Sequence, residues 1–198
     1  MDKPMPSGNE RIVFESKFFE IAVQPMKIGA KIVEFEFLRR SPGVRLLIIK
    51  DNKMLLNREF RSELNSYDYR LPGGKVFDTL KEYKNTLKKE NDILKHAIKA
   101  AKKECEEETG LIVNKLYPLK TSHCGATVVW DLLYFVVDDF KDSAAGQKLE
   151  AGEVIENEWK TFEEVKNMCL NGKIKEDRSV GVLLQFFMGD NSKTYSKE

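Results

Sequence analysis

The stretch AAKKECEEETGL, residues 100–111, carries four glutamates in the last turns of a segment with helical periodicity. Like charges three and four residues apart repel one another on a helix surface, and carboxylates near a helix C-terminus lie at the negative end of the helix dipole. Helix propensity gives no reason for this arrangement. Something must therefore offset the repulsion, and a divalent cation is the obvious candidate. The four residues are Glu104, Glu106, Glu107 and Glu108.

A helical wheel predicts that three of these carboxylates share one face. Glu107 and Glu108 lie about 60° and about 40° to either side of Glu104, whereas Glu106 points away toward solvent. Mg²⁺ takes oxygen ligands and needs only a few carboxylates when substrate phosphates complete its shell. The alternative is a solvated acidic face that is balanced by the nearby lysines.

The flanking segments predict a mixed α+β fold. Apolar strand-like runs cover 44–50, 54–60, 110–119, 127–137 and 154–159, a hairpin turn separates the first two, and a polar loop is expected over 62–68. The central helix begins near Asp92 and stops at Gly110. Two further helices follow: one has a capping box from Thr161 to Glu164 and ends at Asn171-Gly172, and the other covers about 177–188.

Composition excludes several classes of protein. The 198 residues are 41% hydrophobic and 33% charged with a formal net charge of +1, so no global field favours nucleic acid or an anionic membrane. No apolar run is long enough to span a membrane, and the first residues lack the apolar core of a signal peptide. The three cysteines form no CxxC pair. We therefore expect a cytoplasmic protein without nucleic-acid or membrane partners.

The segment KECEEETGL, residues 103–111, resembles the second half of the Nudix box, R-E-U-x-E-E-x-G-U, in which U is apolar. LPGGKV, residues 71–76, resembles the strand and loop that open the same box. The resemblance implies an α/β/α sandwich with a mixed sheet between helices. It also implies metal-dependent hydrolysis of a nucleoside diphosphate derivative, with Mg²⁺ as cofactor and Mn²⁺ as a possible substitute. The implied metal ligands are Glu104, Glu107, Glu108 and the carbonyl of Gly73.

Two positions depart from the family pattern. Lys103 replaces the usual arginine, which keeps the charge but loses the planar fork of the guanidinium. Six residues after Gly74, where the family has a glutamate, the chain has Leu80, and counting back from the helix the same position falls on Lys95. About 15 inserted residues cause this mismatch. The carboxylates that could replace the missing glutamate are Asp78, Glu90 and Asp92.

Beyond the box, the chain resembles the ADP-ribose pyrophosphatase branch of the family. Arg58-Glu59-Phe60-Arg61 matches an R-x-[YF]-R stretch of that branch, and the C-terminal helix pair is also similar. The implied organisation is a flexible N-terminus (1–10), a dimerising β extension (11–39), a Nudix domain (40–188) with an insertion at about 79–91, and a flexible tail (189–198). The expected partners are a nucleotide substrate and a second copy of the chain.

The chemistry of such a site requires phosphate-binding and proton-accepting groups. Arg58 or Arg61 could hold phosphate as a bidentate fork. Glu107 and Glu108 would take part in catalysis. A general base is also needed, and the resemblance to the branch, in which an acidic loop late in the fold supplies it, implies Glu153 or Glu150 of LEAGEV. Aromatic residues that could stack on adenine are Phe19, Phe60 and Tyr69.

ADP-ribose is the first substrate to expect, with hydrolysis to AMP and a sugar phosphate. GDP-mannose, another sugar nucleotide or a nucleoside triphosphate are the enzymatic alternatives. A silent module that binds a nucleotide or a partner protein is the alternative from another class. The lysine-rich insertion is expected to be a solvated helix or flap; covering the substrate and contacting the second subunit are its other possible roles.

Overall fold

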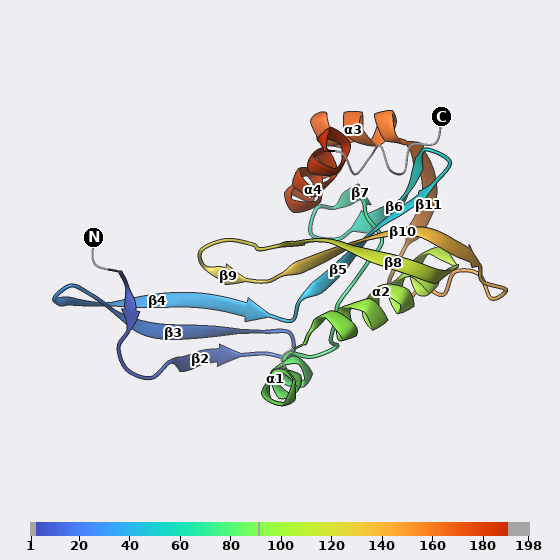
Figure 1. The fold of residues 1–198 in the computed structure, drawn as a ribbon. Coiled ribbons are helices and arrows are strands. Elements are labelled where there is room, and N and C mark those ends of the chain that lie inside the picture. Colours follow the sequence, from blue (N-terminus) through green and yellow to red (C-terminus); the bar gives the residue numbers. More distant parts are fainter. Residues whose placement is uncertain (1–2, 91, 190–198) are drawn as a thin grey trace.

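The computed structural model of the 198-residue chain describes residues 3–90 and 92–189. A six-stranded mixed sheet of order β11-β6-β5-β10-β8, with β7 paired to β6, lies between helix α2 (Leu94–Thr109) on one side and helices α3 (Phe162–Leu170) and α4 (Asp177–Met188) on the other (Figure 1). This arrangement confirms the expected α/β/α class. The strands are β5 (Gly43–Lys50), β6 (Lys53–Arg61), β7 (Ser66–Arg70), β8 (Leu111–Ser122), β10 (Leu132–Asp142) and β11 (Ile155–Thr161).

Strands β5 and β6 diverge immediately after their hairpin. Asp51 and Asn52 adopt φ of 49° and 57°, as the tight turn requires, but only the residue pairs next to the turn are bonded. Farther from the turn, β5 is no longer paired with β6, and the segment that contains the Gly-Gly turn takes the place of β6 beside it. Val44 N donates to the Gly74 carbonyl and Leu46 N donates to the Pro72 carbonyl, each at 2.9 Å. The splayed hairpin therefore seats the Gly-Gly turn against the centre of the sheet.

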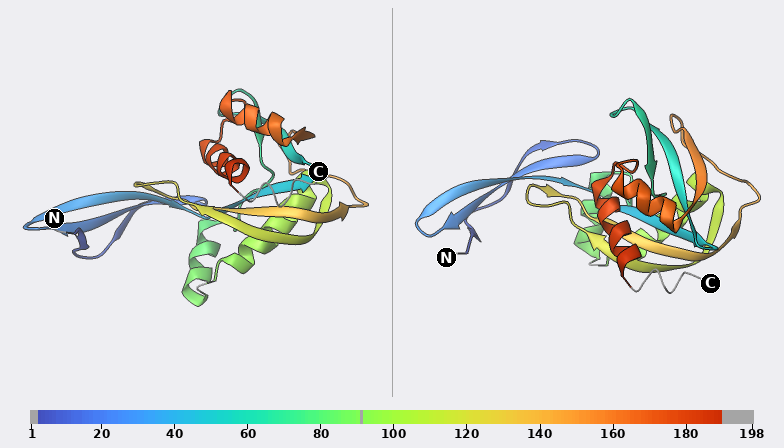
Figure 2. Two further views of the ribbon diagram at one scale, coloured as in Figure 1. Left: turned by 45° about the horizontal axis from the view of Figure 1, so that its top comes forward. Right: turned by 90° about the horizontal axis from the view of Figure 1, so that it is seen from above.

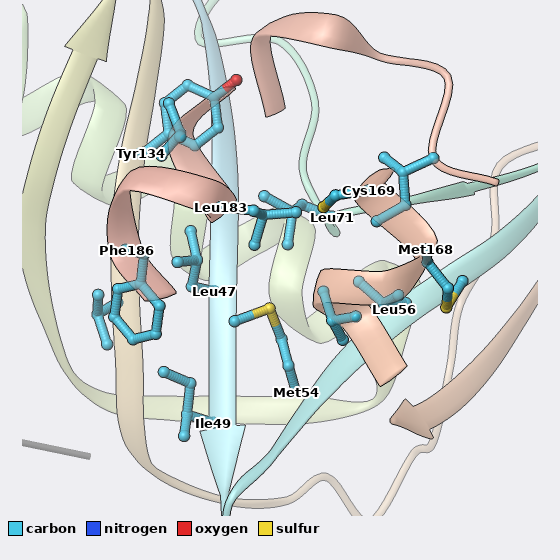
Figure 3. Close-up of a cluster of buried hydrophobic side chains, with 14 of the residues drawn as sticks. Leu47, Ile49, Met54, Leu56, Leu71, Tyr134, Met168, Cys169, Leu183 and Phe186 are labelled. Carbon is cyan, nitrogen blue, oxygen red and sulfur yellow. The ribbon is translucent and has the colours of Figure 1, made fainter. Parts of the chain in front are cut away.

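Each face of the sheet has its own apolar core. Under α2, Ala97, Ala101 and Cys105 pack with no exposed surface against β5 and β10. Figure 3 shows the opposite core, in which Leu47 and Met54 of the hairpin lie close to Leu183 and Phe186 of α4. Small residues on the buried stripe of α2 allow its backbone to approach the sheet closely, which fixes where its acidic last turns lie.

The N-terminal strands form a second sheet that extends away from the central one (Figure 2). Its strands are β1 (Met5–Pro6), β2 (Arg11–Glu15), β3 (Phe19–Ile28), β4 (Lys31–Arg40) and β9 (Val128–Val129). The flexible lead that the sequence predicts over 1–10 is contradicted at Met5 and Pro6, which pair with β3. Most of the expected flexible tail, residues 190–198, lies outside the described residues.

Two segments differ from their sequence-based predictions, and a third adopts one of the two structures that the sequence left open. The polar loop is shorter than 62–68, because Ser66–Arg70 pair with β6 as β7. The apolar run 127–137 is interrupted at Trp130 and Asp131: β9 joins β4 of the N-terminal sheet, and β10 joins the central sheet. The charged insertion contains helix α1 (Leu80–Lys89), which Thr79 caps. None of the described helices is both long and apolar enough to cross a membrane.

Candidate active site

A hollow of about 310 Å³ opens between the last turns of α2, the Gly-Gly turn and the splayed β6. Most of the predicted site residues line it, together with several charged residues that the sequence did not indicate. The lining includes Arg40, Arg45, Asn57, Glu59, Arg61, Arg70, Gly73, Gly74, Lys75, Asp78, Lys103, Glu104, Glu107, Glu108, Trp130, Glu150 and Glu153.

Hydrogen bonds to its terminal carbonyls secure the acidic end of α2. Gly110 ends the helix in the left-handed conformation at φ 70°, as predicted. The Glu108 carbonyl accepts from Gln147 Nε2 at 2.6 Å and from Asn157 Nδ2 at 3.1 Å, and the Glu107 carbonyl accepts from Lys148 N at 2.8 Å. Because these carbonyls have no partner within a helix, the capping by remote residues holds the glutamates in place.

The Gly-Gly turn brings the backbone close to the sheet and to the Glu104 carboxylate. Gly73 has φ 144°, and a Cβ there would lie 2.2 Å from the Val44 carbonyl oxygen. A Cβ on Gly74 would lie 2.2 Å from Glu104 Oε1. Contacts this short do not occur between non-bonded atoms, so Gly73 requires glycine, whereas a side chain on Gly74 would displace the Glu104 carboxylate. The turn therefore leaves space for a carboxylate directly beside the backbone.

Glu108 is the most enclosed acid of the hollow, with 7% of its surface exposed. Its Oε2 accepts from Gly73 N at 2.8 Å and from Asn57 Nδ2 at 2.9 Å. Burial raises the pKa of Glu108 to about 8, the bond from Gly73 opposes the shift, and the neighbouring Glu104 adds to it. The buried Asn57 Oδ1 has no hydrogen-bond partner within the described chain.

Glu104 and Glu107 are held differently. Burial raises the pKa of Glu104 to about 7; Lys103 opposes this shift, and the charge of Glu107 adds to it. The Glu107 carboxylate lies 2.9 Å from Lys103 Nζ. Within residues 3–90 and 92–189, no three acidic, histidine or cysteine side chains are grouped closely enough to make a ready-made metal cluster. The three predicted ligands thus line one hollow, but their carboxylates do not converge.

The donor set nevertheless fits a divalent cation. Two enclosed carboxylates lie in this hollow: the charge of Glu104 raises the pKa of Glu108, and the charge of Glu107 raises the pKa of Glu104, so a cation among them would relieve the repulsion. The partnerless Asn57 oxygen adds a neutral acceptor, and oxygen donors of these kinds suit Mg²⁺ or Mn²⁺. Glu107 could join them by releasing Lys103.

Of the two predicted phosphate ligands, only Arg61 faces the hollow. Successive residues of a strand point to opposite faces, and Asn57, Glu59 and Arg61 share the face that lines the hollow. Arg58 lies outside it, with its guanidinium 3.8 Å from the Tyr67 ring centroid and 2.7 Å from Glu156 Oε2. The prediction for Arg58 is therefore wrong for this hollow, because the strand directs that side chain to the opposite face.

The acidic loop contributes both predicted base candidates to the hollow. Glu150 and Glu153 line it, and a turn joins them: Glu153 Oε2 accepts from Glu150 N at 2.9 Å, and Glu153 N donates to the Glu150 carbonyl at 3.1 Å. Glu153 is half-buried and Glu150 is exposed. The charge of Glu153 also raises the pKa of both Glu104 and Glu108, so it lies within electrostatic reach of both.

Among the candidates for the missing glutamate, Asp78 alone lines the hollow. Glu90 pairs with Lys95 and His96, and Asp92 accepts from Leu94 N at 2.9 Å at the start of α2. Leu80, at the position of the family glutamate, is buried. The insertion has therefore moved that position out of the site.

Several lining residues were missed from the sequence. Arg45 is buried and forms a two-point pair with Glu176, with Nη2 to Oε1 at 2.7 Å and Nε to Oε2 at 2.9 Å. A charge inside the apolar run VRLLIIK was the available signal. Trp130 lines the hollow, whereas the aromatic candidates Phe19, Phe60 and Tyr69 do not.

Comparison with known proteins places this geometry in a family. The NUDIX domain family matches residues 39–180. A CMP-5'-(N-acetyl-N-hydroxy-3-aminopropyl)phosphonate hydrolase of Streptomyces rubellomurinus (strain ATCC 31215) is 27% identical over 186 residues, which cover 91% of this chain and 81% of that protein. The crystal structure of an ADP compounds hydrolase superposes with a TM-score of 0.73 at 18% identity, covering 98% of this chain and 97% of that one.

Proposed function

The chain belongs to the Nudix family and is a Nudix hydrolase, and from this premise we propose that it hydrolyses the diphosphate linkage of a nucleoside diphosphate derivative in the hollow beside α2. The observation that supports this proposal most strongly is the pair of enclosed carboxylates, Glu104 and Glu108, against a Gly-Gly turn whose missing side chains leave room for them.

We propose Glu104, Glu108, Glu107 and the Gly73 carbonyl as the residues that would hold the divalent cation, with Mg²⁺ as the physiological ion and Mn²⁺ as a substitute. Bound there, the cation would neutralise charge on the diphosphate and make a water molecule more acidic. Asn57 and the Gly73 amide hold Glu108 in place through the bonds described above. The cost of enclosing two like charges would be offset once the cation is bound.

The chain's own residues would supply the remaining steps. Arg61 would bind a phosphate by exchanging its exposed partner Glu63, which lies 2.8 Å away, for the substrate oxygen. Glu153, with Glu150 as the alternative, would accept the proton of the attacking water. The water oxygen forms a bond to one phosphorus as the bond from that phosphorus to the bridging oxygen breaks, so two monophosphates leave.

ADP-ribose is the proposed substrate, with AMP and ribose 5-phosphate as products. The supporting features are the match to an ADP compounds hydrolase fold over 98% of the chain and the residues that resemble the ADP-ribose pyrophosphatase branch. The relative that acts on a CMP-linked phosphonate favours a second candidate, a nucleoside monophosphate joined to a phosphonate. Both substrates contain the same type of phosphorus anhydride.

The test is a hydrolysis panel at fixed Mg²⁺ with ADP-ribose, a CMP-linked alkylphosphonate, GDP-mannose and a nucleoside triphosphate. Glu108→Gln should lower kcat by about 100-fold or more, since even the loss of a residue that only hydrogen-bonds to a metal ligand costs about 10- to 100-fold. Glu106→Gln, whose side chain accepts from Ser143 at the other side of the helix, should retain wild-type turnover. No turnover by the wild-type protein, with ADP-ribose binding unaffected by Mg²⁺, would favour a silent binding module.

We also propose a cytoplasmic homodimer that forms through the N-terminal sheet. Large apolar side chains are exposed on that sheet, including Ile12, Phe14 and Val33. Exposed apolar surface on a sheet favours a protein partner. The three cysteines are free thiols, as expected for a reducing compartment.

A further inference from the structure

Two arginines share one tryptophan at the edge of the hollow. The guanidinium carbon of Arg40 lies 4.2 Å from the Trp130 ring centroid, and that of Arg178 lies 4.4 Å from it. Arg178 Nη1 donates to the Trp130 carbonyl at 2.6 Å, which fixes the cation beside its own stacking partner. Two guanidinium groups therefore lie against the same indole ring, although one cation is enough for a cation–π interaction.

These two cations differ from the other arginines around the hollow. Arg45 pairs with Glu176, Arg61 with Glu59 and Arg70 with Asp68, at 2.7 to 2.8 Å.

Arg40 and Arg178, in contrast, form no ion pair in the part of the chain that the structure describes. Burial lowers the pKa of Arg40, and the charges of Arg45 and Arg178 lower it further. The buried Nη2 of Arg178 has no hydrogen-bond partner among the described residues.

A third cation completes this wall of the hollow. Lys75 directly follows the Gly-Gly turn and pairs with Gly43 through an isolated bridge. Its Nζ lies 5.5 Å from the Phe18 ring centroid, and no carboxylate of residues 3–90 or 92–189 pairs with it. Arg40, Lys75 and Trp130 all line the hollow, and we call this part of its lining the basic wall. A molecule bound in the hollow can therefore contact the basic wall.

The basic wall is separated from the carboxylates by only the backbone of the Gly-Gly turn. On one side, Gly74 adjoins the Glu104 carboxylate; on the other, a Cβ on Gly43 would lie 3.0 Å from the Gly74 carbonyl oxygen and 3.8 Å from Trp130 Nε1. A molecule whose diphosphate lies at Glu104 and Glu108 could therefore reach Arg40 with a neighbouring group.

We propose that Arg40 and Lys75, supported by Trp130 and Arg178, form a subsite for a further anionic group that the substrate carries outside the diphosphate. The group is a phosphate, phosphonate or carboxylate on the moiety that leaves with the second phosphorus. The inference rests on the proposed function and narrows its substrate class: the enzyme should prefer derivatives with an acidic leaving moiety to those with a neutral sugar. A charge-assisted bond to an otherwise unpaired guanidinium supplies the discrimination.

The test compares matched substrates that differ in one anionic group: ADP-ribose with ADP-ribose 1″-phosphate, and UDP-glucose with UDP-glucuronate. Wild-type kcat/KM should be at least tenfold higher for the acidic member of a pair. Arg40→Gln should remove most of that preference by raising KM for the acidic member. Lys99→Gln, the same loss of charge on the exposed side of α2, should change neither, and thermal unfolding should show that each variant is folded.

Equal kcat/KM for both members in the wild type, or a preference that persists in Arg40→Gln, would overturn the subsite. If the wild type cleaves none of the four compounds, the proposed function fails instead. In that case, Kd values from calorimetry still test the subsite, because binding does not require turnover. ADP-ribose 1″-phosphate should bind at least tenfold more tightly than ADP-ribose, and Arg40→Gln should abolish the difference.

Discussion

At the level of single residues, the enclosure of Glu104 and Glu108 and their proposed role as metal ligands favour opposite protonation states. Enclosure favours their protonated forms, with pKa values of about 7 and about 8, whereas the proposed metal site needs both as carboxylates. In the unfolded chain both groups ionise near pH 4.5, their ordinary value. The folded protein therefore binds more protons than the unfolded protein between these limits.

The metal-free protein should lose stability as the pH rises. Its stabilisation by the protonated acids is complete below about pH 4.5 and declines as the pH passes through about 7 and about 8. In EDTA, Tm should fall between pH 5.5 and pH 8.5, and saturating Mg²⁺ should largely remove the fall. A Tm in EDTA that is constant or rises over this range would contradict the enclosure of the two acids.

The buried pair of Arg45 and Glu176 should contribute strongly to stability. Their side chains are only 10% and 11% exposed, and burial with two hydrogen bonds leaves Arg45 uncompensated if its partner is removed. Glu176→Ala should lower the free energy of unfolding by about 3 kcal/mol, at the lower end of the range for broken buried pairs. Urea denaturation measures this change, with Glu156→Ala in the exposed pair with Arg58 as the control that should show almost none.

The positions of Arg58 and Arg61 along one strand already limit which of them can bind phosphate. Arg58 and Arg61 differ by an odd number of positions on one strand, so they cannot both face the same hollow. Asn57, which bonds Glu108, has the parity of Arg61. Which face of β6 lines the hollow depends on how β6 diverges from β5. This is a tertiary feature, and the periodicity of the sequence does not predict it.

At the scale of elements, α2 was predictable because its periodicity, apolar stripe and Gly110 stop agree with one another. The residues that cap its carbonyls were not predictable. Gln147 and Asn157 lie far from the helix in sequence, and nothing in a polar loop or a strand marks them as helix caps. Local sequence thus predicted the acidic face but not what holds it.

The prediction of one continuous strand over 127–137 was wrong for a similar reason. Strand patterning identifies residues that suit a sheet, but it does not say which sheet they join. Val128 and Val129 pair with β4, and the chain then crosses to the central sheet at Leu132. Trp130 lies in that crossing, which is why it lines the hollow while it also packs against the core on the side of α3 and α4.

Helix α1 connects the insertion to the N-terminal sheet through a buried carboxylate. Lys84 Nζ lies 2.6 Å from Glu20 Oε2 and 3.0 Å from Glu15 Oε2, and Glu20 is only 2% exposed. Lys84→Met should leave Glu20 with Arg39 as its remaining cation and loosen this junction. Amide hydrogen exchange should become faster in β3 and α1 but not in α2, whereas Lys81→Met should change none of them. Unchanged exchange in Lys84→Met would mean that α1 does not brace the sheet.

At the scale of the whole molecule, the N-terminal sheet has one face with a continuous apolar row. Ala22 lies opposite Phe37, and Met26 lies opposite Val33, so these side chains share a face with Phe35. Val33→Glu should convert the proposed dimer to a monomer. Ile32→Glu is the control on the other face, where it should leave the mass unchanged although Ile32 is 65% exposed. Light scattering after size-exclusion chromatography measures both masses; a wild-type monomer would contradict the proposal.

The whole hollow draws on segments from Arg40 to Glu153, and the sequence predicted only the parts that carry a motif. The glycines and glutamates of the box were identified because their spacing is fixed by one turn and one helix. Arg40, Arg45, Arg70 and Trp130 come from separate strands and crossings, and only the packed sheets bring them together. The fold was therefore more predictable than the full lining of its site.

An equilibrium titration with Mn²⁺, followed by electron paramagnetic resonance, would test directly whether α2 carries a metal site. Wild type and Glu106→Gln should bind the ion with equal affinity, and Glu104→Gln and Glu108→Gln should each weaken binding by at least tenfold. Absence of binding by the wild-type protein, or equal weakening in Glu106→Gln, would contradict a metal site built from the enclosed face of α2.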